Sequence, residues 1–223
     1  MVIRKDRPFD GACYHIVLRG NNRAYILEEE RDKRKFLSLL RQYKQNGDFE
    51  LFHYCLMNNH VHLVMRLVRG DRLAKIMQGI CQSFTHHWKR TRGFVGCLWQ
   101  PPYRRFLIQD AAYLLECGRY VERNPVRARL VSRPADYPWS SYTCYARTRQ
   151  DALVDANPEY LGWSRRPSIR RRMYREYVEI ARPYEGMLDA ALMTHTLRRI
   201  NPWGETGSTD DVLSTQGGQK LPG

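Results

Sequence analysis

The chain of 223 residues is long enough for one full domain with extensions, and its hydrophobic content of 43% is sufficient for a packed core. Its 37 Lys and Arg residues exceed its 23 Asp and Glu residues, and the net charge of +14 makes nucleic acid the first candidate for a partner. No apolar run approaches the ~20 residues that a membrane span needs. The first residues contain no apolar signal segment, so we expect a cytoplasmic protein.

The six cysteines are spread along the chain, and none forms a Cys-x-x-Cys pair. This spacing matches neither a zinc knuckle nor a local redox-active cysteine pair. In a chain of this length without a signal segment, we expect the thiols to be reduced.

The first part of the chain alternates between strand and helix patterns. A strand is predicted over 12–18, and turn residues follow it at 19–23. Apolar residues at helical spacing predict a helix over 29–45, which Asn46-Gly47 ends. Strands are predicted at 49–57 and 60–67, and the Asn58-Asn59 pair between them favours a hairpin.

The pattern continues with a long helix over 71–91, a short strand over 104–108 and a helix over about 110–123. Asp110 is the expected N-cap of this last helix. Asn124-Pro125 is expected to stop it, because proline disfavours helical geometry in the residue before it. The βαββαβα order predicts an α+β fold, with one antiparallel sheet and helices packed on one face.

Beyond residue 131 the periodic pattern weakens, and the chain is expected to wrap over the domain. We therefore assign residues 1–145 to the main domain and 146–200 to a basic helical extension. The extension contains a basic amphipathic helix over 168–182. Residues 201–223 are rich in Gly, Ser, Thr and Gln, and we expect them to be disordered.

Two histidines open the predicted strand over 60–67. Side chains at i and i+2 of a strand point to the same face, so His60 and His62 are expected to lie side by side. Two imidazoles on one face make half of a divalent-metal site. On the predicted helix, Tyr120 and Asn124 lie one turn apart on one face. We expect His60, His62 and the amide oxygen of Asn124 to hold Mg²⁺ or Mn²⁺ beside Tyr120.

Five segments carry a resemblance to the REP-associated tyrosine transposases, relatives of the single-tyrosine insertion-sequence transposases in the HUH endonuclease superfamily. The segments are Tyr14-His15-Ile16-Val17-Leu18-Arg19-Gly20-Asn21, Met57-Asn58-Asn59-His60-Val61-His62-Leu63-Val64, Leu98-Trp99-Gln100, Arg119-Tyr120-Val121-Glu122-Arg123-Asn124-Pro125-Val126-Arg127-Ala128 and Trp139-Ser140-Ser141-Tyr142. They follow the family's order over residues 10–145. The resemblance implies a ferredoxin-like HUH core that cleaves single-stranded DNA near palindromic hairpins.

The resemblance also implies roles for individual residues. His60 and His62 match the metal-binding histidines, and Tyr120 matches the nucleophile that forms a covalent 5′-phosphotyrosine intermediate. Asn124 stands where related enzymes have a metal-binding glutamine, and its shorter side chain leaves Glu122 and His53 as reserve ligands. The REP-associated group is monomeric, so a monomer is expected rather than a homodimer.

Other assignments remain open from the sequence. Tyr113, expected to face elsewhere on the helix, is the rival nucleophile. A zinc site made of His53, Cys55, His60 and His62 is the rival metal site. The chain is expected to be an enzyme, but a catalytically silent hairpin-binding regulator is the alternative. The third possible function is a metal hydrolase in which water, rather than a tyrosine, attacks the phosphate. The remaining histidines, such as His15, are expected to be structural or to face DNA.

Eight residues are candidate DNA contacts, because cationic, amide and aromatic side chains bind phosphates and stack on bases. They are Arg19, Asn21, Asn22, Arg23, Trp99, Arg104, Arg105 and Arg127. Solvated surface charge and a core tryptophan are the competing interpretations. The arginine-rich helix over 168–182 either clamps the hairpin duplex through its phosphates or presents a plain solvated face.

Overall fold

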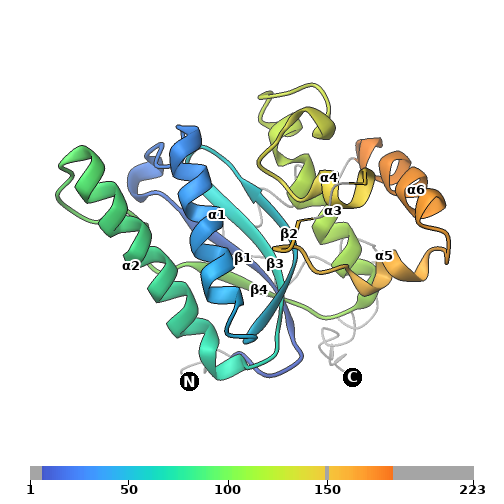
Figure 1. Ribbon diagram of the computed structural model, residues 1–223, viewed down its shortest axis with the longest axis horizontal. Helices are drawn as coiled ribbons and strands as arrows, with labels where there is room; N and C mark the ends of the chain where they lie inside the picture. The colour runs from blue at the N-terminus through green and yellow to red at the C-terminus, as the bar shows by residue number, and fades with distance from the viewer. Residues whose placement is uncertain (1–6, 149–150, 183–223) are drawn as a thin grey trace, which may run out of the picture. The chain divides into compact units, whose positions relative to one another are not determined.

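The computed structural model describes residues 7–148 and 151–182. Its centre is a four-stranded sheet in the order β2-β3-β1-β4, in which every neighbouring pair is antiparallel (Figure 1). The strands are β1 (Cys13–Arg19), β2 (Phe49–Leu56), β3 (His60–Leu67) and β4 (Arg104–Ile108). The predicted strands are confirmed to within one residue at each end, and the predicted tail at 201–223 lies outside the described residues.

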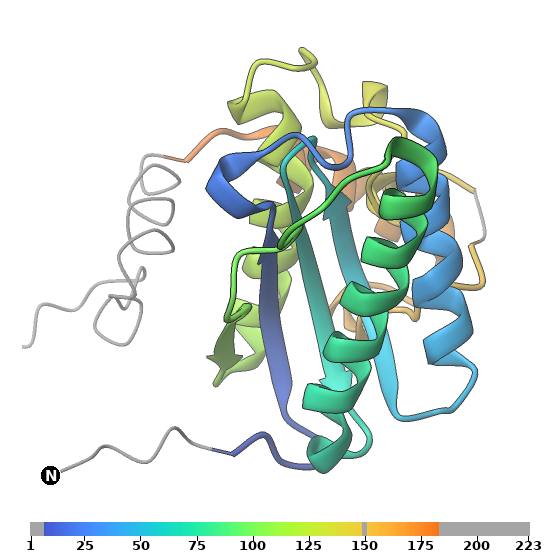
Figure 2. The same ribbon diagram turned by 90° about the vertical axis from the view of Figure 1, so that its left-hand side faces the viewer.

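Three long helices connect or follow the strands. They are α1 (Glu30–Lys44), α2 (Leu73–Arg92) and α3 (Ala111–Arg127). The expected α+β class and the βαββαβα order are therefore confirmed, and the order is that of a ferredoxin-like split βαβ fold. Helices α1 and α2 lie together on one face of the sheet, as expected, whereas α3 lies on the other face (Figure 2).

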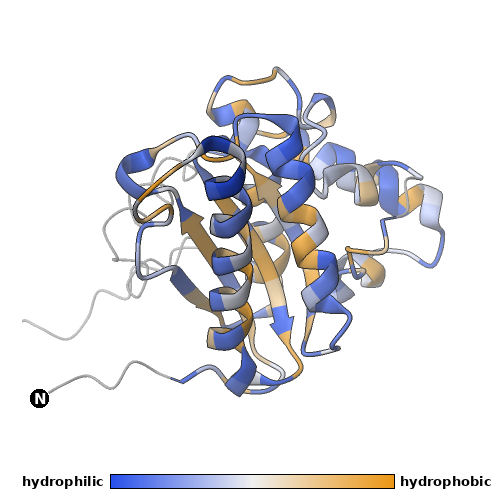
Figure 3. Cartoon of the chain, turned by 60° about the vertical axis from the view of Figure 1, so that its left-hand side comes forward, coloured by the Kyte–Doolittle hydropathy of each residue, from blue (hydrophilic) through white to orange (hydrophobic). Residues whose placement is uncertain are grey.

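The face beneath α1 and α2 is the larger hydrophobic core. Strand residues such as Ile16 and Leu63, which are opposite each other in β1 and β3, are fully buried there. From the helices, Phe36 and Phe84 meet edge to face with ring centroids 5.6 Å apart. Figure 3 shows the apolar strands under the two amphipathic helices. Because successive side chains of a strand point to opposite faces, every second side chain lies in this core and the others face α3.

The α3 face combines apolar packing with polar side chains. Gly118 lies in the middle of α3 against the ring of His53 on β2, and any β-carbon at this position would overlap that ring. A glycine inside a helix costs about 1 kcal/mol relative to alanine. Here it allows the helix to pack closely on the strand. At the start of α3, the Asp110 side chain accepts a hydrogen bond from the Tyr113 amide at 2.7 Å, so the predicted N-cap is confirmed.

The predicted end of α3 is wrong, because the helix continues through Pro125 to Arg127. A proline inside a helix removes the hydrogen bond to the carbonyl four residues earlier, which here belongs to Val121. The side-chain amide of Asn124 donates to that carbonyl at 3.3 Å and to the carbonyl of Tyr120 at 2.9 Å. The carbonyl left without its backbone partner is thereby satisfied, so the last turn of the helix remains intact.

The chain after α3 covers the outer edge of the sheet and the outer side of α3. Hydrogen bonds from the Leu56 amide to the Trp139 carbonyl and from the Ser141 amide to the Tyr54 carbonyl tie residues 139–141 along β2. Three helices follow, namely α4 (Tyr142–Ala146), α5 (Pro158–Gly162) and α6 (Pro167–Glu179). The expected wrapping segment and the basic helix are both present, although α6 is shorter than predicted.

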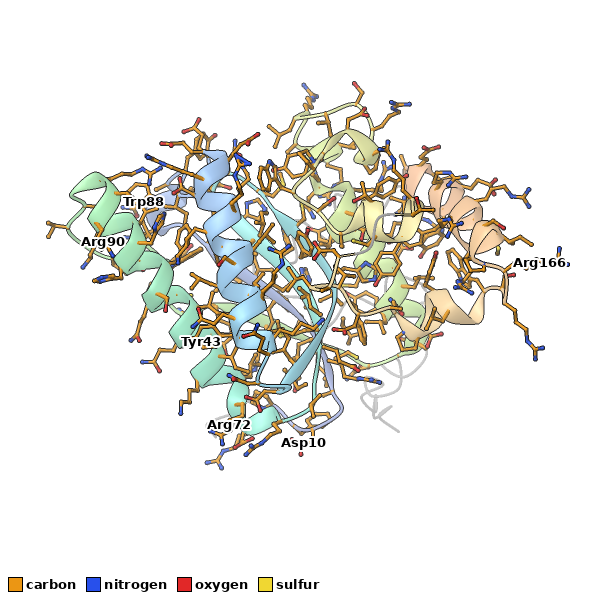
Figure 4. The ribbon with its side chains drawn as sticks, in the orientation of Figure 1. Asp10, Tyr43, Arg72, Trp88, Arg90 and Arg166 are labelled. Carbon is orange, nitrogen blue, oxygen red and sulfur yellow. The ribbon has the colours of Figure 1, made fainter. Side chains whose placement is uncertain are left out.

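Helix α6 packs its apolar side on the domain through the buried residues Tyr174 and Val178. Of its basic residues, Arg172 and Arg175 are exposed and Arg170 is half-buried against the Tyr160 ring, while Arg166, just before the helix, points away from the protein (Figure 4). None of the helices in the described residues is long and apolar enough to cross a membrane. The assignment of 146–200 as a separate extension stays a prediction.

Candidate active site

The two histidines of the predicted metal site lie at the start of β3. In the antiparallel register, His60 is opposite Arg19 and His62 is opposite Val17 on β1. Both imidazoles point to the α3 face, as the period of two requires, and their ring centroids are 4.8 Å apart. His62 is buried and His60 is half-buried, so His60 is the member of the pair nearer to the surface.

In both histidines the Nδ1 nitrogen has a polar partner. The Nδ1 of His60 is 2.6 Å from the side-chain oxygen of Asn59, which accepts its proton and leaves Nε2 with a lone pair. The Nδ1 of His62 is 2.9 Å from the Nε2 of His15. Its own Nε2 is buried and has no hydrogen-bond partner among the described residues. An unsatisfied buried nitrogen of this kind fits a metal ligand.

The surroundings keep these imidazoles uncharged. Burial lowers the pKa of His60 to about 3, and the nearby Arg19 adds to the effect. Burial also lowers the pKa of His15 to about 3, with a smaller contribution from His60. The pKa of His62 is lowered well below its usual value, chiefly by burial. A neutral imidazole is the form that binds a metal ion.

Tyr120 faces the histidines from α3. Its ring centroid is 5.9 Å from that of His62 and 6.0 Å from that of His15, in edge-to-face geometry in both cases. Burial raises the pKa of Tyr120 to about 12, which keeps the phenol protonated near neutral pH. The fold thus brings together the tyrosine and the histidine pair, which lie on different elements.

The rival nucleophile Tyr113 is on the same side of α3 as Tyr120, and the expectation that it faces elsewhere is wrong. The two residues are seven positions apart, which corresponds to two helical turns, or roughly 10 Å along the axis. The ring contacts of the described residues join Tyr120, rather than Tyr113, to His15 and His62. Burial raises the pKa of Tyr113 as well.

Cationic side chains surround this cluster. The guanidinium of Arg127 lies 4.7 Å from the centroid of the Tyr120 ring. Arg19 lies near enough to Arg104, Arg23 and Tyr120 for their charges to influence its pKa, which burial lowers. Arg104 is opposite Val17 in β4, on the same face as the histidines. Such a setting favours an anionic substrate such as a phosphodiester.

The predicted third ligand, Asn124, is buried one turn after Tyr120. Because its amide nitrogen donates to two helix carbonyls, its oxygen is the atom directed away from the helix backbone. No group of three or more His, Cys, Asp or Glu side chains within 7–148 and 151–182 is placed to hold a metal ion. Asn124 belongs to another residue type, and its role as a ligand stays a prediction.

The reserve ligands Glu122 and His53 belong to a separate buried network. The Glu122 carboxylate accepts from His53 Nδ1 at 3.0 Å, from the Ser141 hydroxyl at 2.6 Å and from the Tyr174 hydroxyl at 2.7 Å. The other ring nitrogen of His53 bonds to Asn157 at 3.0 Å. Both side chains therefore have other partners than His60 and His62, and the rival zinc site loses His53 as a ligand.

Trp99 is a core residue. Its ring is buried against Phe36 and Phe84, with centroids 5.9 and 5.5 Å away. The expectation that Trp99 stacks on a base is therefore not supported, because Trp99 lies among the aromatic residues of the core beneath α1 and α2. Arg105 is opposite Ile16 in the register, so it also points to this side of the sheet and away from the histidines.

Three candidate DNA contacts form a short turn beside the histidines. Asn21, Asn22 and Arg23 make a 3-10 turn directly after β1, and Asn22 and Arg23 have positive φ angles of 50° and 58°. The side chain of Asn59, next to His60, donates to the Arg23 carbonyl at 3.3 Å. This turn is thereby fixed against the hairpin that precedes the histidine pair, and Asn22 and Arg23 are exposed.

His15 is the site residue that sequence reasoning missed. It was expected to be structural or to face DNA, but it contacts both His62 and Tyr120. The sequence places His15 on the same strand face as Val17, two residues further on. It does not show that His15 meets His62, because that contact depends on the register between β1 and β3.

Comparison with known proteins identifies the family of this chain. A family model described as "Transposase IS200 like" matches residues 9–124, and the chain belongs to that family. A Haemophilus influenzae protein named as a REP-associated tyrosine transposase is 24% identical over 169 residues, which cover 70% of this chain and 89% of the relative. The resemblance found in the sequence is thereby confirmed at the level of the family.

Two solved structures are also similar. One is a REP-associated tyrosine transposase bound to a REP hairpin, with 17% identity and a TM-score of 0.56 over 70% of this chain and 98% of that one. This likeness supports the fold. The other is described as a transposase from Deinococcus radiodurans, with 17% identity and a TM-score of 0.38 over 54% of this chain and 97% of that one.

Proposed function

We propose that this protein is a metal-dependent endonuclease and strand transferase that acts on single-stranded DNA near palindromic hairpins. The observation that carries the proposal is the contact between Tyr120 and His62, whose buried Nε2 has no hydrogen-bond partner among the described residues. The basic surroundings of the site and the membership of the IS200-like transposases support it. A relative solved with a REP hairpin makes hairpin DNA the first substrate to test.

His60, His62 and Asn124 are the residues that would hold Mg²⁺ or Mn²⁺. When bound there, the ion would polarise the scissile phosphate and stabilise the leaving oxygen. The protein contributes two neutral imidazoles and an amide oxygen directed away from α3. Because these ligands carry no negative charge, the site keeps its attraction for a phosphodiester.

Tyr120 is the proposed nucleophile. Its phenolic oxygen forms a bond to phosphorus, the bond from phosphorus to the 3′ oxygen breaks, and the leaving oxygen takes a proton to become a free 3′-OH. The phenolic proton is lost to solvent, and the tyrosine remains linked to the 5′ phosphate. Arg127, whose guanidinium lies over the Tyr120 ring, is placed to favour the phenolate that this attack requires.

We also propose that the protein acts as a monomer in the cytoplasm. The outer edge of β2 is bonded to residues 139–141, and the Tyr145 hydroxyl donates to the Phe52 carbonyl at 2.8 Å. An edge strand that is covered in this way has fewer free groups for pairing with a second sheet. Sedimentation velocity of the full chain tests this expectation, and a concentration-independent dimer would contradict it.

Incubation with a labelled hairpin carrying a single-stranded flank, in the presence of Mn²⁺, tests the main proposal. The wild type is expected to form a protein–DNA adduct that survives denaturing electrophoresis, together with a free 3′-OH fragment. Tyr120→Phe should form no adduct, whereas Tyr113→Phe, which removes the rival hydroxyl, should form it. An adduct in Tyr120→Phe would assign the nucleophile elsewhere.

The same experiment separates the alternative functions. A silent hairpin-binding regulator would shift the hairpin in a mobility assay, with equal affinity in Mn²⁺ and EDTA, and would leave it uncut. A hydrolase that uses water would cut the DNA and leave no protein attached. Either result in the wild type would replace the proposed function.

A further inference from the structure

His15 has no role in the proposed chemistry, yet it lies within hydrogen-bond distance of a predicted ligand. Its Nε2 is 2.9 Å from the Nδ1 of His62, and the two rings stack with centroids 5.1 Å apart and planes inclined by 25°. In the register, His62 is opposite Val17, so His15 is its diagonal neighbour across the strand pair. Both imidazoles are buried, which makes the hydrogen bond between them a fixed element of the site.

The hydrogen bond between two imidazoles can run in either direction. If His15 donates, the Nδ1 of His62 is the acceptor, and the proton of the neutral His62 ring resides on Nε2. If His62 donates, its proton resides on Nδ1, and its Nε2 carries a lone pair. Only the second direction leaves His62 able to bind a metal ion through Nε2.

The environment of His62 favours that second direction. Its Nε2 has no acceptor among the described residues, so a proton there would be a buried N–H without a partner, which is rare in proteins. His60 has the equivalent arrangement, because its Nδ1 faces the side-chain oxygen of Asn59. Each of the two predicted histidine ligands thus has a hydrogen-bond partner on Nδ1, as metal-binding histidines generally do.

We propose that His15 is a positioning residue that accepts the Nδ1 proton of His62 and thereby presents the Nε2 lone pair of His62 to the divalent ion. The inference rests on the proposed function of His60 and His62 as metal ligands. It assigns His15 to the metal site through hydrogen bonding rather than through direct ligation.

Two variants separate the hydrogen bond from packing. His15→Phe keeps an aromatic ring between Phe106 and Tyr120, whose centroids are each 6.0 Å from that of His15, but has no acceptor. His15→Gln supplies an amide oxygen that can accept the His62 proton. Phe106→Leu is the matched control, because it changes the packing on His15 and leaves the acceptor in place.

The test measures Mn²⁺ binding by electron paramagnetic resonance on the full chain without DNA. We expect His15→Phe to weaken binding by 10- to 100-fold, His15→Gln to recover most of the loss, and Phe106→Leu to bind within about 3-fold of the wild type. Equal affinity of His15→Phe and the wild type would overturn the role of His15 alone. A wild type that binds no Mn²⁺, or binds it equally well after His60→Ala and His62→Ala, would instead overturn the proposed metal site.

A second measurement needs no variant of His15. Long-range ¹H–¹⁵N correlation spectra of the metal-free wild type distinguish the tautomers of each histidine, and His62→Ala assigns the His62 signals by their loss. A proton on Nδ1 of His62 supports the proposal. A proton on Nε2 overturns it, even if His15→Phe fails to fold.

Discussion

The guanidinium of Arg127 lies over the ring of Tyr120, 4.7 Å from its centroid. The two residues are two helical turns apart on α3, and this contact requires the helix to continue through Pro125. The Asn124 side chain, which donates to the carbonyls of Tyr120 and Val121, supports that continuation. A fixed cation therefore stands beside the phenol that we propose as the nucleophile.

Removal of the Arg127 charge is expected to slow the covalent step. Burial raises the pKa of Tyr120 to about 12, and Arg127 opposes this rise through its charge and hydrogen bond. Without Arg127 the pKa increases further, so a smaller fraction of Tyr120 is phenolate at any pH. One pKa unit corresponds to a tenfold change in that fraction. Arg127→Ala should therefore slow single-turnover adduct formation by about tenfold or more, and its pH–rate profile should move to higher pH.

Arg105 provides the matched control, because it carries the same charge on the opposite face of the sheet. Arg105→Ala should leave the pH–rate profile of adduct formation in place, even if it weakens DNA binding. An identical pH profile in Arg127→Ala and the wild type would show that Arg127 does not act on Tyr120.

The Glu122 network is expected to be a major contributor to stability. Its carboxylate is fully buried and accepts from His53, Ser141 and Tyr174, which join α3 to β2, to the wrapping chain and to α6. Glu122→Ala leaves these donors without an acceptor and should lower the free energy of unfolding by about 3–5 kcal/mol. Urea denaturation followed by circular dichroism measures the loss.

Glu122→Gln should cost much less than Glu122→Ala. His53 and Ser141 both donate to Oε1, which the amide retains, and the new amide nitrogen can donate to the Tyr174 hydroxyl. Glu176, which is exposed on α6, serves as the surface control, and its replacement by alanine should change stability by less than about 0.5 kcal/mol. Equal losses in all three variants would refute the network's role.

The buried imidazoles predict a loss of stability at mildly acidic pH in the metal-free protein. In the unfolded chain they take up protons near pH 6.5, whereas burial lowers the pKa of His15 and of His60 to about 3 in the folded state. Between these values the unfolded state binds more protons, so stability falls as the pH falls. The slope should approach about 1.4 kcal/mol per pH unit for each imidazole.

Urea denaturation in EDTA at several pH values between 7.5 and 5.5 measures this dependence. His15→Phe removes one of the groups, so its stability should fall less steeply than that of the wild type over the same range. Parallel pH dependence in the two proteins would mean that His15 is not held neutral by the fold.

Trp99 distinguishes core packing from contact with DNA. Because its ring packs against Phe36 and Phe84, Trp99→Ala should lower the free energy of unfolding by about 3–5 kcal/mol. Trp99→Phe should keep most of the stability and the full hairpin affinity. A tenfold loss of affinity in Trp99→Phe, with stability unchanged, would restore the base-stacking role.

The strands and helices up to α3 were predictable because their signals are local. Alternation of apolar residues located the strands to within one residue, and the cap at Asp110 located the start of α3. The end of α3 was not predictable from Pro125, because the side chain of the preceding residue, Asn124, compensates for the lost backbone hydrogen bond. Helices α4 and α5 are each only five residues long and gave no periodic signal in the sequence.

The sequence by itself determined the order of the elements, the basic character of the chain and the common face of His60 and His62, since periods of 2 and 3.6 residues require no knowledge of distant contacts. The tertiary structure decided which groups those histidines meet. The pairing of His62 with His15 joins positions 47 residues apart and depends on strand register. The approach of Tyr120 depends on the packing of α3 across the sheet. Such partners are set by the packing of whole elements, and for that reason they appear only in the folded protein.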